Sequence, residues 1–126
     1  MKKLLVLLTL LLSGCGSDEV VNSLGTQMWN DVSISVEART ASNSDFYEFL
    51  VIATIGRNKP AHNLFVHVRV NEDDAWKQSI QDGMVGVYRR AIKVAHPDKD
   101  VLFIQLRRGE EQGELRFPLN LPPRKV

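Results

Sequence analysis

Apolar and polar residues alternate along several segments of this chain. The segment Val32-Ser33-Ile34-Ser35-Val36-Glu37 places its apolar residues at every second position. Successive side chains of a β-strand point to opposite faces, so this period of two indicates a strand with one buried face. The same logic marks six further segments. The predicted strands are therefore 32–37, 46–55, 62–70, 75–80, 84–94, 101–108 and 114–119.

Turn-forming residues separate these predicted strands. Asp82-Gly83 suits a two-residue type I′ turn, in which both central residues need positive φ, and so predicts a hairpin between 75–80 and 84–94. Nothing in the pattern alternates strands with helices. The sequence therefore predicts an all-β, seven-stranded antiparallel β-sandwich of immunoglobulin-like type, with a transthyretin-like sandwich as the alternative. The stretch from Asp82-Gly83 to Tyr88 also loosely resembles the Asp-Gly-x-Tyr pattern of bacterial immunoglobulin-like domains.

The chain begins with a charged and then an apolar segment. Lys2 and Lys3 precede an apolar run over 4–12, which is interrupted only by Thr9 and is about half of the roughly 20 residues that cross a bilayer as a helix. Leu12-Ser13-Gly14-Cys15 follows, and it resembles the lipobox of bacterial lipoproteins. That resemblance implies acylation of the Cys15 sulfur, cleavage just before it, and attachment to a membrane through the lipid.

The lipobox resemblance also implies a cellular location and a domain organisation. Gly16 stands where an aspartate favours the inner membrane in Gram-negative relatives, so we expect the periplasmic face of the outer membrane. The expected parts are a signal peptide over 1–14, a lipidated N-terminus and tether over 15–30, a β-sandwich domain over 31–121 and a C-terminal tail over 122–126. The remaining length suits one domain.

Composition narrows the function classes. Cys15 is the only cysteine, so no intramolecular disulfide can form. The full chain carries a net charge of +1, which gives no global field favouring nucleic acid. No nucleophile elbow, zinc motif or phosphate loop is present, and we expect neither a cofactor nor catalysis. The acidic run 72–74 lacks the glycine and the spacing of a calcium loop.

The outward side of three predicted strands carries the most suggestive residues. When the leucines and valines of 62–70, 101–108 and 114–119 face the core, the outward positions include arginines and aromatics. These strands are neighbours in an immunoglobulin-like order. The resulting candidate binding face contains Phe65, His67, Arg69, Phe103, Arg107 and Arg116, with Val101 continuing the apolar stripe.

Such a face has two functional interpretations and one structural one. Aromatic and arginine anchors are enriched at protein interfaces, which predicts an envelope protein as partner. Guanidinium groups also bind carboxylates and phosphates, which predicts an envelope glycan or a small ligand. Structurally, the 16–30 segment would cover the phenylalanines, while Glu114 or Glu48 would pair with the arginines.

Overall fold

A computed structural model describes residues 19–41, 44–81 and 83–123. These ranges contain strands and connecting loops. Within them no helix is long or apolar enough to span a membrane. The strands are β1 (Glu19–Trp29), β2 (Val32–Ala41), β3 (Phe46–Ile55), β4 (Lys59–Pro60), β5 (Phe65–Val70), β6 (Lys77–Gln81), β7 (Val87–Lys93), β8 (Val101–Arg108) and β9 (Glu111–Pro118).

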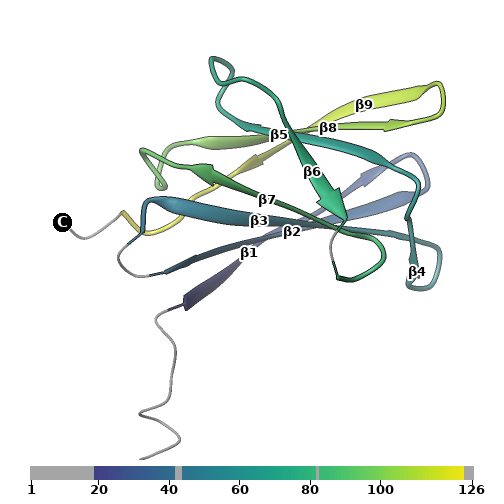
Figure 1. The fold of residues 1–126 in the computed structure, drawn as a ribbon, viewed down its shortest axis with the longest axis horizontal. Coiled ribbons are helices and arrows are strands. Elements are labelled where there is room, and N and C mark those ends of the chain that lie inside the picture. The colour runs from purple at the N-terminus through teal and green to yellow at the C-terminus, as the bar shows by residue number, and fades with distance from the viewer. Residues whose placement is uncertain (1–18, 42–43, 82, 124–126) are drawn as a thin grey trace, which may run out of the picture.

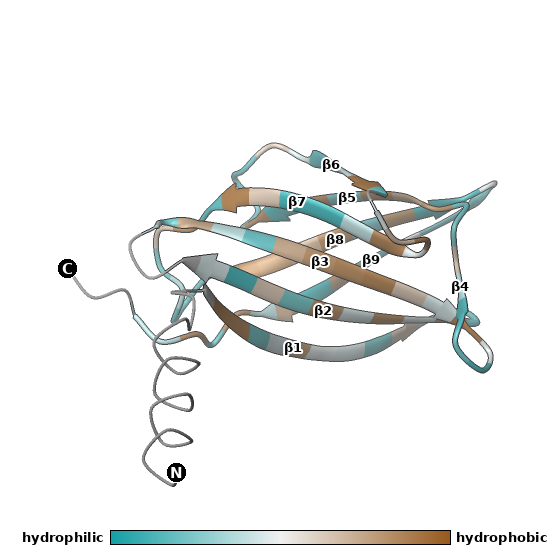
Figure 2. Cartoon of the chain, turned by 60° about the horizontal axis from the view of Figure 1, so that its bottom comes forward, coloured by the Kyte–Doolittle hydropathy of each residue, from teal (hydrophilic) through white to brown (hydrophobic). Residues whose placement is uncertain are grey.

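All strand pairs are antiparallel, and they form one continuous sheet that curls nearly to closure. The strand order is β1-β2-β3-β7-β6-β5-β8-β9, with β4 paired to β3. Because β6 pairs with both β5 and β7, it joins the two halves of the sheet. Figure 2 shows β1, β2, β3 and β7 as one wall, with β8 and β9 behind them. The all-β antiparallel prediction is confirmed.

All seven predicted strands are present, and two further strands were missed. The predicted bounds of 46–55 and 101–108 coincide with those of β3 and β8. The structure adds β1 and the two-residue β4.

The expected tether over 15–30 needs correction, because 19–29 form β1 and pair with β2 along the whole strand. The domain thus begins before the predicted boundary at Asp31. A bulge between Ser23 and Gly25 breaks the alternation of β1, and this irregularity hid the strand. Cys15 and the predicted signal peptide lie outside the described residues.

The hairpin predicted at Asp82-Gly83 exists, but its connection is longer than two residues. β6 ends at Gln81 and β7 begins at Val87, so more than two residues connect the strands, and Asp82 itself lies outside the described residues. The last turn of this loop is fixed by Gly86, which has φ +82° and lies against Pro60, where a Cβ would come within 2.7 Å of the proline Cβ. The Gly86 carbonyl accepts a 2.9 Å hydrogen bond from the Ala53 amide. The end of this loop is therefore already bonded to β3, next to the first residue of β7.

The core lies between the two halves of the sheet. Val66, Val68, Ile104 and Phe117 are each at most 1% exposed, which confirms the predicted facing of β5, β8 and β9. Leu50 is buried as well, although it lies on the outer side of β3 between Glu37 and Arg89 on the neighbouring strands. Burying these side chains supplies the main favourable free energy of folding.

Side chains close the seam between β1 and β9, the two ends of the strand order. Trp29 is buried at this seam and lies against Gly113. The Gln27 side-chain amide donates a 2.6 Å hydrogen bond to the Arg116 carbonyl. Arg108 donates a 2.7 Å hydrogen bond to Asp31, and its guanidinium lies 5.6 Å from the Trp29 ring centre. The sheet is thus sealed here by side-chain contacts.

The chain enters and leaves the domain at the same end. In Figure 1, β1 begins on the left, where the described C-terminal segment after β9 also lies. The Leu119 amide donates to the Asp100 carbonyl, and the Leu121 amide donates to the Pro97 carbonyl. These bonds hold the C-terminal segment against the β7–β8 loop.

Candidate interaction face

The three strands that carry the predicted face are neighbours. β5 pairs with β8, and β8 pairs with β9, as expected from the sequence. The register places Arg69, Phe103 and Arg116 in one row across the strands. We call the outer surface of β5, β8 and β9 the arginine face.

Phe103 does not form part of an exposed apolar stripe. Its side chain is only 5% exposed, because the guanidinium carbons of Arg69 and Arg116 lie 5.4 and 5.2 Å from its ring centre. Cations at such distances are attracted by the electron-rich ring face. The predicted stripe is therefore an aromatic residue capped by two arginines.

A second arginine and phenylalanine pair lies farther along the same strands. Arg107 on β8 is opposite Phe65 on β5, and its guanidinium lies 4.7 Å from the Phe65 ring centre. Phe65 remains 47% exposed, so this end of the face presents an accessible aromatic side chain. His67 lies between the two arginine clusters, flanked by Gln105 and Gln78 on the adjacent strands.

The sequence interpretation missed Trp76 as a member of this face. The Arg69 guanidinium lies 4.2 Å from the Trp76 ring centre, closer than it lies to Phe103. Its Nη1 also donates a 3.0 Å hydrogen bond to the Glu72 carbonyl. Trp76 precedes β6, and pairing of the following residues with β5 brings it toward Arg69. The available signal was a tryptophan on the side of predicted strand 75–80 that also carries Gln78 and Ile80.

The three arginines of the face form no ion pair with a described carboxylate. Other arginines do: Arg89 lies 3.6 Å from Glu48, and Arg39 lies 3.4 Å from Glu37. The anticipated pairing of Glu48 or Glu114 with this face is absent from the described ion pairs. In addition, Arg69 Nε is buried without a hydrogen-bond partner among the described groups. The guanidinium groups are oriented by aromatic rings rather than neutralised by acids.

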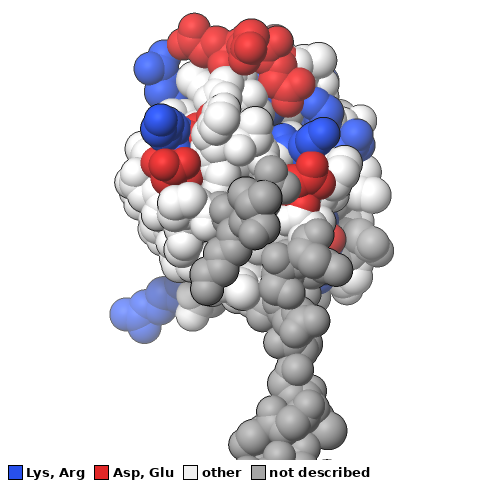
Figure 3. Space-filling view, turned by 90° about the vertical axis from the view of Figure 1, so that its left-hand side faces the viewer, with Lys and Arg blue, Asp and Glu red and all other residues white. Residues whose placement is uncertain are grey.

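Acidic residues gather at one end of the molecule, beyond this face. Figure 3 shows them over the β5–β6 loop, which carries Glu72, Asp73 and Asp74. Partial burial alone would raise the pKa of Asp74, but the hydrogen bond and charge of Lys77 lower it overall. The described residues contain no group of three side chains suited to a metal ion. The acidic loop is a solvated turn held by Lys77.

The face has the chemistry of a recognition surface: fixed cations, an exposed aromatic ring and hydrogen-bonding amides on adjacent strands. Its arginines can donate paired N–H groups to carboxylate or phosphate oxygens. No family model matches this chain, and neither a curated protein nor a solved structure shows significant similarity to it.

Proposed function

We propose that this chain is a lipid-anchored, non-enzymatic interaction subunit of the bacterial cell envelope, which binds an acidic protein partner through the arginine face. The observation that carries the proposal is the stacking of Arg69, Arg107 and Arg116 on aromatic rings without a carboxylate partner among the described residues. Arginines that already pair with acids have less unneutralised charge and fewer free N–H donors with which to bind a partner.

Stacking supports binding in two ways. It orders long side chains before the partner arrives, which reduces the conformational entropy lost on association. Contact with a ring also uses the planar face of the group and not its N–H donors, although at Arg69 one of these donors, Nη1, already bonds to the Glu72 carbonyl. Trp76 and Phe103 thus both contact the Arg69 guanidinium, while Phe65 contacts that of Arg107.

We further propose that the domain is related to immunoglobulin-like sandwiches. The neighbour order β2-β3-β7-β6 and β5-β8-β9 supports this, since it matches strands A-B-E-D and C-F-G of that fold. Three features depart from the simple pattern: β1 extends the first group, β4 pairs with β3, and β6 pairs with both groups.

The proposed anchor is Cys15, and the expected address is the periplasmic face of the outer membrane. Support comes from the lipobox-like residues 12–15 and from Gly16. Two or three acyl chains would hold the protein stably, since each buried methylene contributes about 0.8 kcal/mol. Replacing Cys15 with serine should move the protein out of the membrane fraction. Mass spectrometry of the native N-terminus that finds an unmodified cysteine would contradict the anchor.

Affinity capture tests the partner. The lipoprotein is crosslinked in its native membranes, purified and compared with Arg69→Ala, Arg107→Ala and Arg116→Ala variants. Each change should weaken binding by about 1 to 2 kcal/mol, and the effect should shrink as salt rises. Arg39→Ala is the matched control, because Arg39 lies on β2 and pairs with Glu37. Unchanged capture by a triple variant with an unchanged melting temperature would remove the face from consideration.

A second candidate is recognition of an anionic envelope glycan. The exposed Phe65 ring beside Arg107 favours it, because this pair offers a ring and a bidentate donor to one ligand. The same capture distinguishes the candidates: a stoichiometric protein supports the assembly role, whereas a copurified polysaccharide supports the glycan.

A further inference from the structure

The sheet opens between β6 and β7. The two strands pair at only two positions, Ile80 with Arg89 and Gln81 with Tyr88. Beyond these, residues 90–93 of β7 pair with β3 on one side only. Residues 77–79 of β6 likewise pair with β5 and not with β7. Within the described ranges, two strand edges therefore face each other without a connecting ladder.

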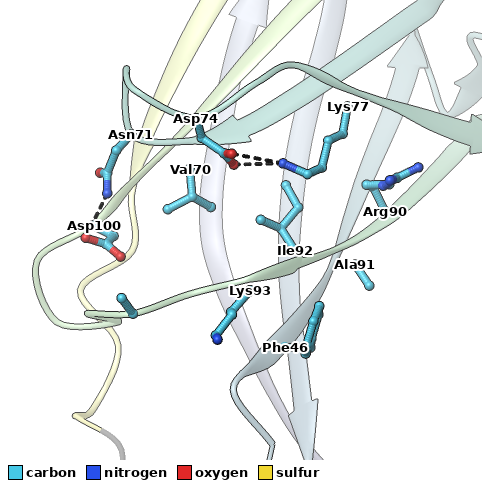
Figure 4. Close-up of a pocket in the computed structure, with 11 residues that line it drawn as sticks. Phe46, Val70, Asn71, Asp74, Lys77, Arg90, Ala91, Ile92, Lys93 and Asp100 are labelled. Atoms are coloured by element: carbon cyan, nitrogen blue, oxygen red, sulfur yellow. Dashed lines mark hydrogen bonds and ion pairs between the residues drawn. The ribbon is translucent and has the colours of Figure 1, made fainter.

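A cleft occupies this opening. Its volume is about 390 Å³, and its wall includes Lys77 and Asp74 on one side and Arg90, Ala91 and Lys93 on the other (Figure 4). A second hollow of about 400 Å³ is lined by Ile80 and by the ion pair of Arg89 with Glu48, and it shares Arg90 and Ala91 with the first. The edge of β7 at Arg90 and Ala91 is thus bordered by open space in both hollows.

The position of Arg90 shows that a neighbour is lacking here. Arg90 pairs with Phe49, a fully buried core residue of β3, so the backbone turns both side chains toward the same side of the sheet. Arg90 is nevertheless exposed, and so is Ala91. A strand paired with β7 beside these two residues would normally shield them from solvent.

The side chains around the cleft favour one kind of occupant. Val70 and Ile92 provide an apolar surface within it. Asp74 is paired with Lys77 at 2.9 Å, and Asp100 accepts hydrogen bonds from Asn71 and from the His96 amide.

Lys93 also has a partner, since it lies 3.5 Å from Asp45. Arg90 is the cationic lining residue that forms no ion pair with a described carboxylate. The charge still available in the cleft is therefore positive and lies at the bare edge of β7.

We propose that this cleft binds an extended peptide segment of a partner protein, which adds as a strand to β7 along Arg90–Lys93. The segment would run antiparallel to β7, in the direction that β6 takes where it pairs. An apolar side chain would contact Val70 and Ile92, and a carboxylate would meet Arg90. Bare strand edges supply main-chain hydrogen bonds that a peptide backbone matches, while side-chain contacts select its sequence.

This proposal is independent of the arginine face, because none of the face arginines lines the cleft. The probe is a capped peptide, Thr-Val-Thr-Glu-Thr-Val, titrated into the isotopically labelled full-length protein in detergent. Its valines and its glutamate share one face, as Ile92 and Arg90 do on β7. Backbone amide signals of Arg90, Ala91 and Lys93 should shift saturably. Hydrogen exchange should slow at Ala91 and Lys93, whose amides alternate with those that bond to β3 and would therefore face the added chain.

Two control peptides isolate the physical basis. A peptide of the same sequence with N-methyl groups on alternate amides keeps its side chains but loses donors, and it should bind at least about tenfold more weakly. Replacing the probe's glutamate with glutamine should weaken binding to the parent protein. It should make little difference to an Arg90→Gln variant, while Arg107→Ala should bind both peptides as the parent does.

Three results would overturn the proposal. Absence of saturable shifts at Arg90 to Lys93 would show that the cleft takes no strand. Equal affinity of the N-methylated peptide would show that it holds only the carboxylate. Shifts confined to β5, β8 and β9 would place peptide binding on the arginine face, and would leave the proposed function intact.

Discussion

Gly113 should be required for closure of the seam between β1 and β9. A Cβ at this position would overlap the indole nitrogen of Trp29 and come within 2.6 Å of its Cδ1. Glycine inside a strand is otherwise unfavourable, so Gly113→Ala would stabilise an open site by about 0.5 to 1 kcal/mol. Forcing an extra methyl into a packed site costs about 1 to 3 kcal/mol. The overlap is severe, so we expect a net loss of about 1 to 2 kcal/mol.

A double-mutant cycle separates these two effects. Trp29→Val removes every indole atom that the new methyl would meet, and in that background Gly113→Ala should be neutral or slightly stabilising. Urea unfolding followed by circular dichroism measures the four free energies, and the coupling should be about 2 kcal/mol. A Gly113→Ala variant as stable as the parent, or equal effects in both backgrounds, would refute the contact between Trp29 and residue 113.

Three further predictions concern the core and two titratable groups. Val68→Asp should cost several kcal/mol because Val68 is fully buried, while Phe65→Asp on the opposite side of β5 should be far milder; denaturant melts with equal losses would contradict the facing. The hydrogen bond from Arg108 holds the pKa of Asp31 below its usual value, so the ionised carboxylate should stabilise the fold above about pH 4 and lose this effect as pH falls through the depressed pKa. Between about pH 5 and pH 2, the Asp31→Asn variant should therefore lose less stability than the parent. Burial raises the pKa of Tyr88, so the stability of the fold should decrease as pH rises above about 10, and this decrease should be smaller in the Tyr88→Phe variant. At neutral pH the same variant should lose about 1 to 3 kcal/mol, because the buried Ala61 carbonyl loses the 2.7 Å hydrogen bond from the Tyr88 hydroxyl.

The sequence predicts a strand well when one of its faces is buried and the other exposed along its whole length. β8 alternates regularly, with Leu102, Ile104 and Leu106 fully buried, and its bounds match the prediction. β1 fails the same test because its bulge at Ser23 to Gly25 shifts the register, and because an edge strand has weaker burial demands.

The arginine face shows a second limit. Alternation predicts which side of the sheet Phe103 takes, but it does not tell which residues of adjacent strands lie over it. The cross-strand row of Arg69, Phe103 and Arg116 depends on register, and register depends on pairing between segments distant in the chain. Burial of Phe103 and the contact with Trp76 follow only from that register.

The early start of β1 has a consequence for how the protein would meet its partner. With the anchor proposed at Cys15, Glu19 lies four residue steps from the lipidated residue, a reach of at most about 14 Å. The domain would then remain close to the bilayer, with the start of β1 and the β7–β8 loop nearest the lipid headgroups and its strands leading away from it (Figure 1). Encounter with a partner would become a search within a thin layer beside the membrane, where confinement raises the effective concentration of both molecules. A modest affinity in solution would suffice for nearly full occupancy there.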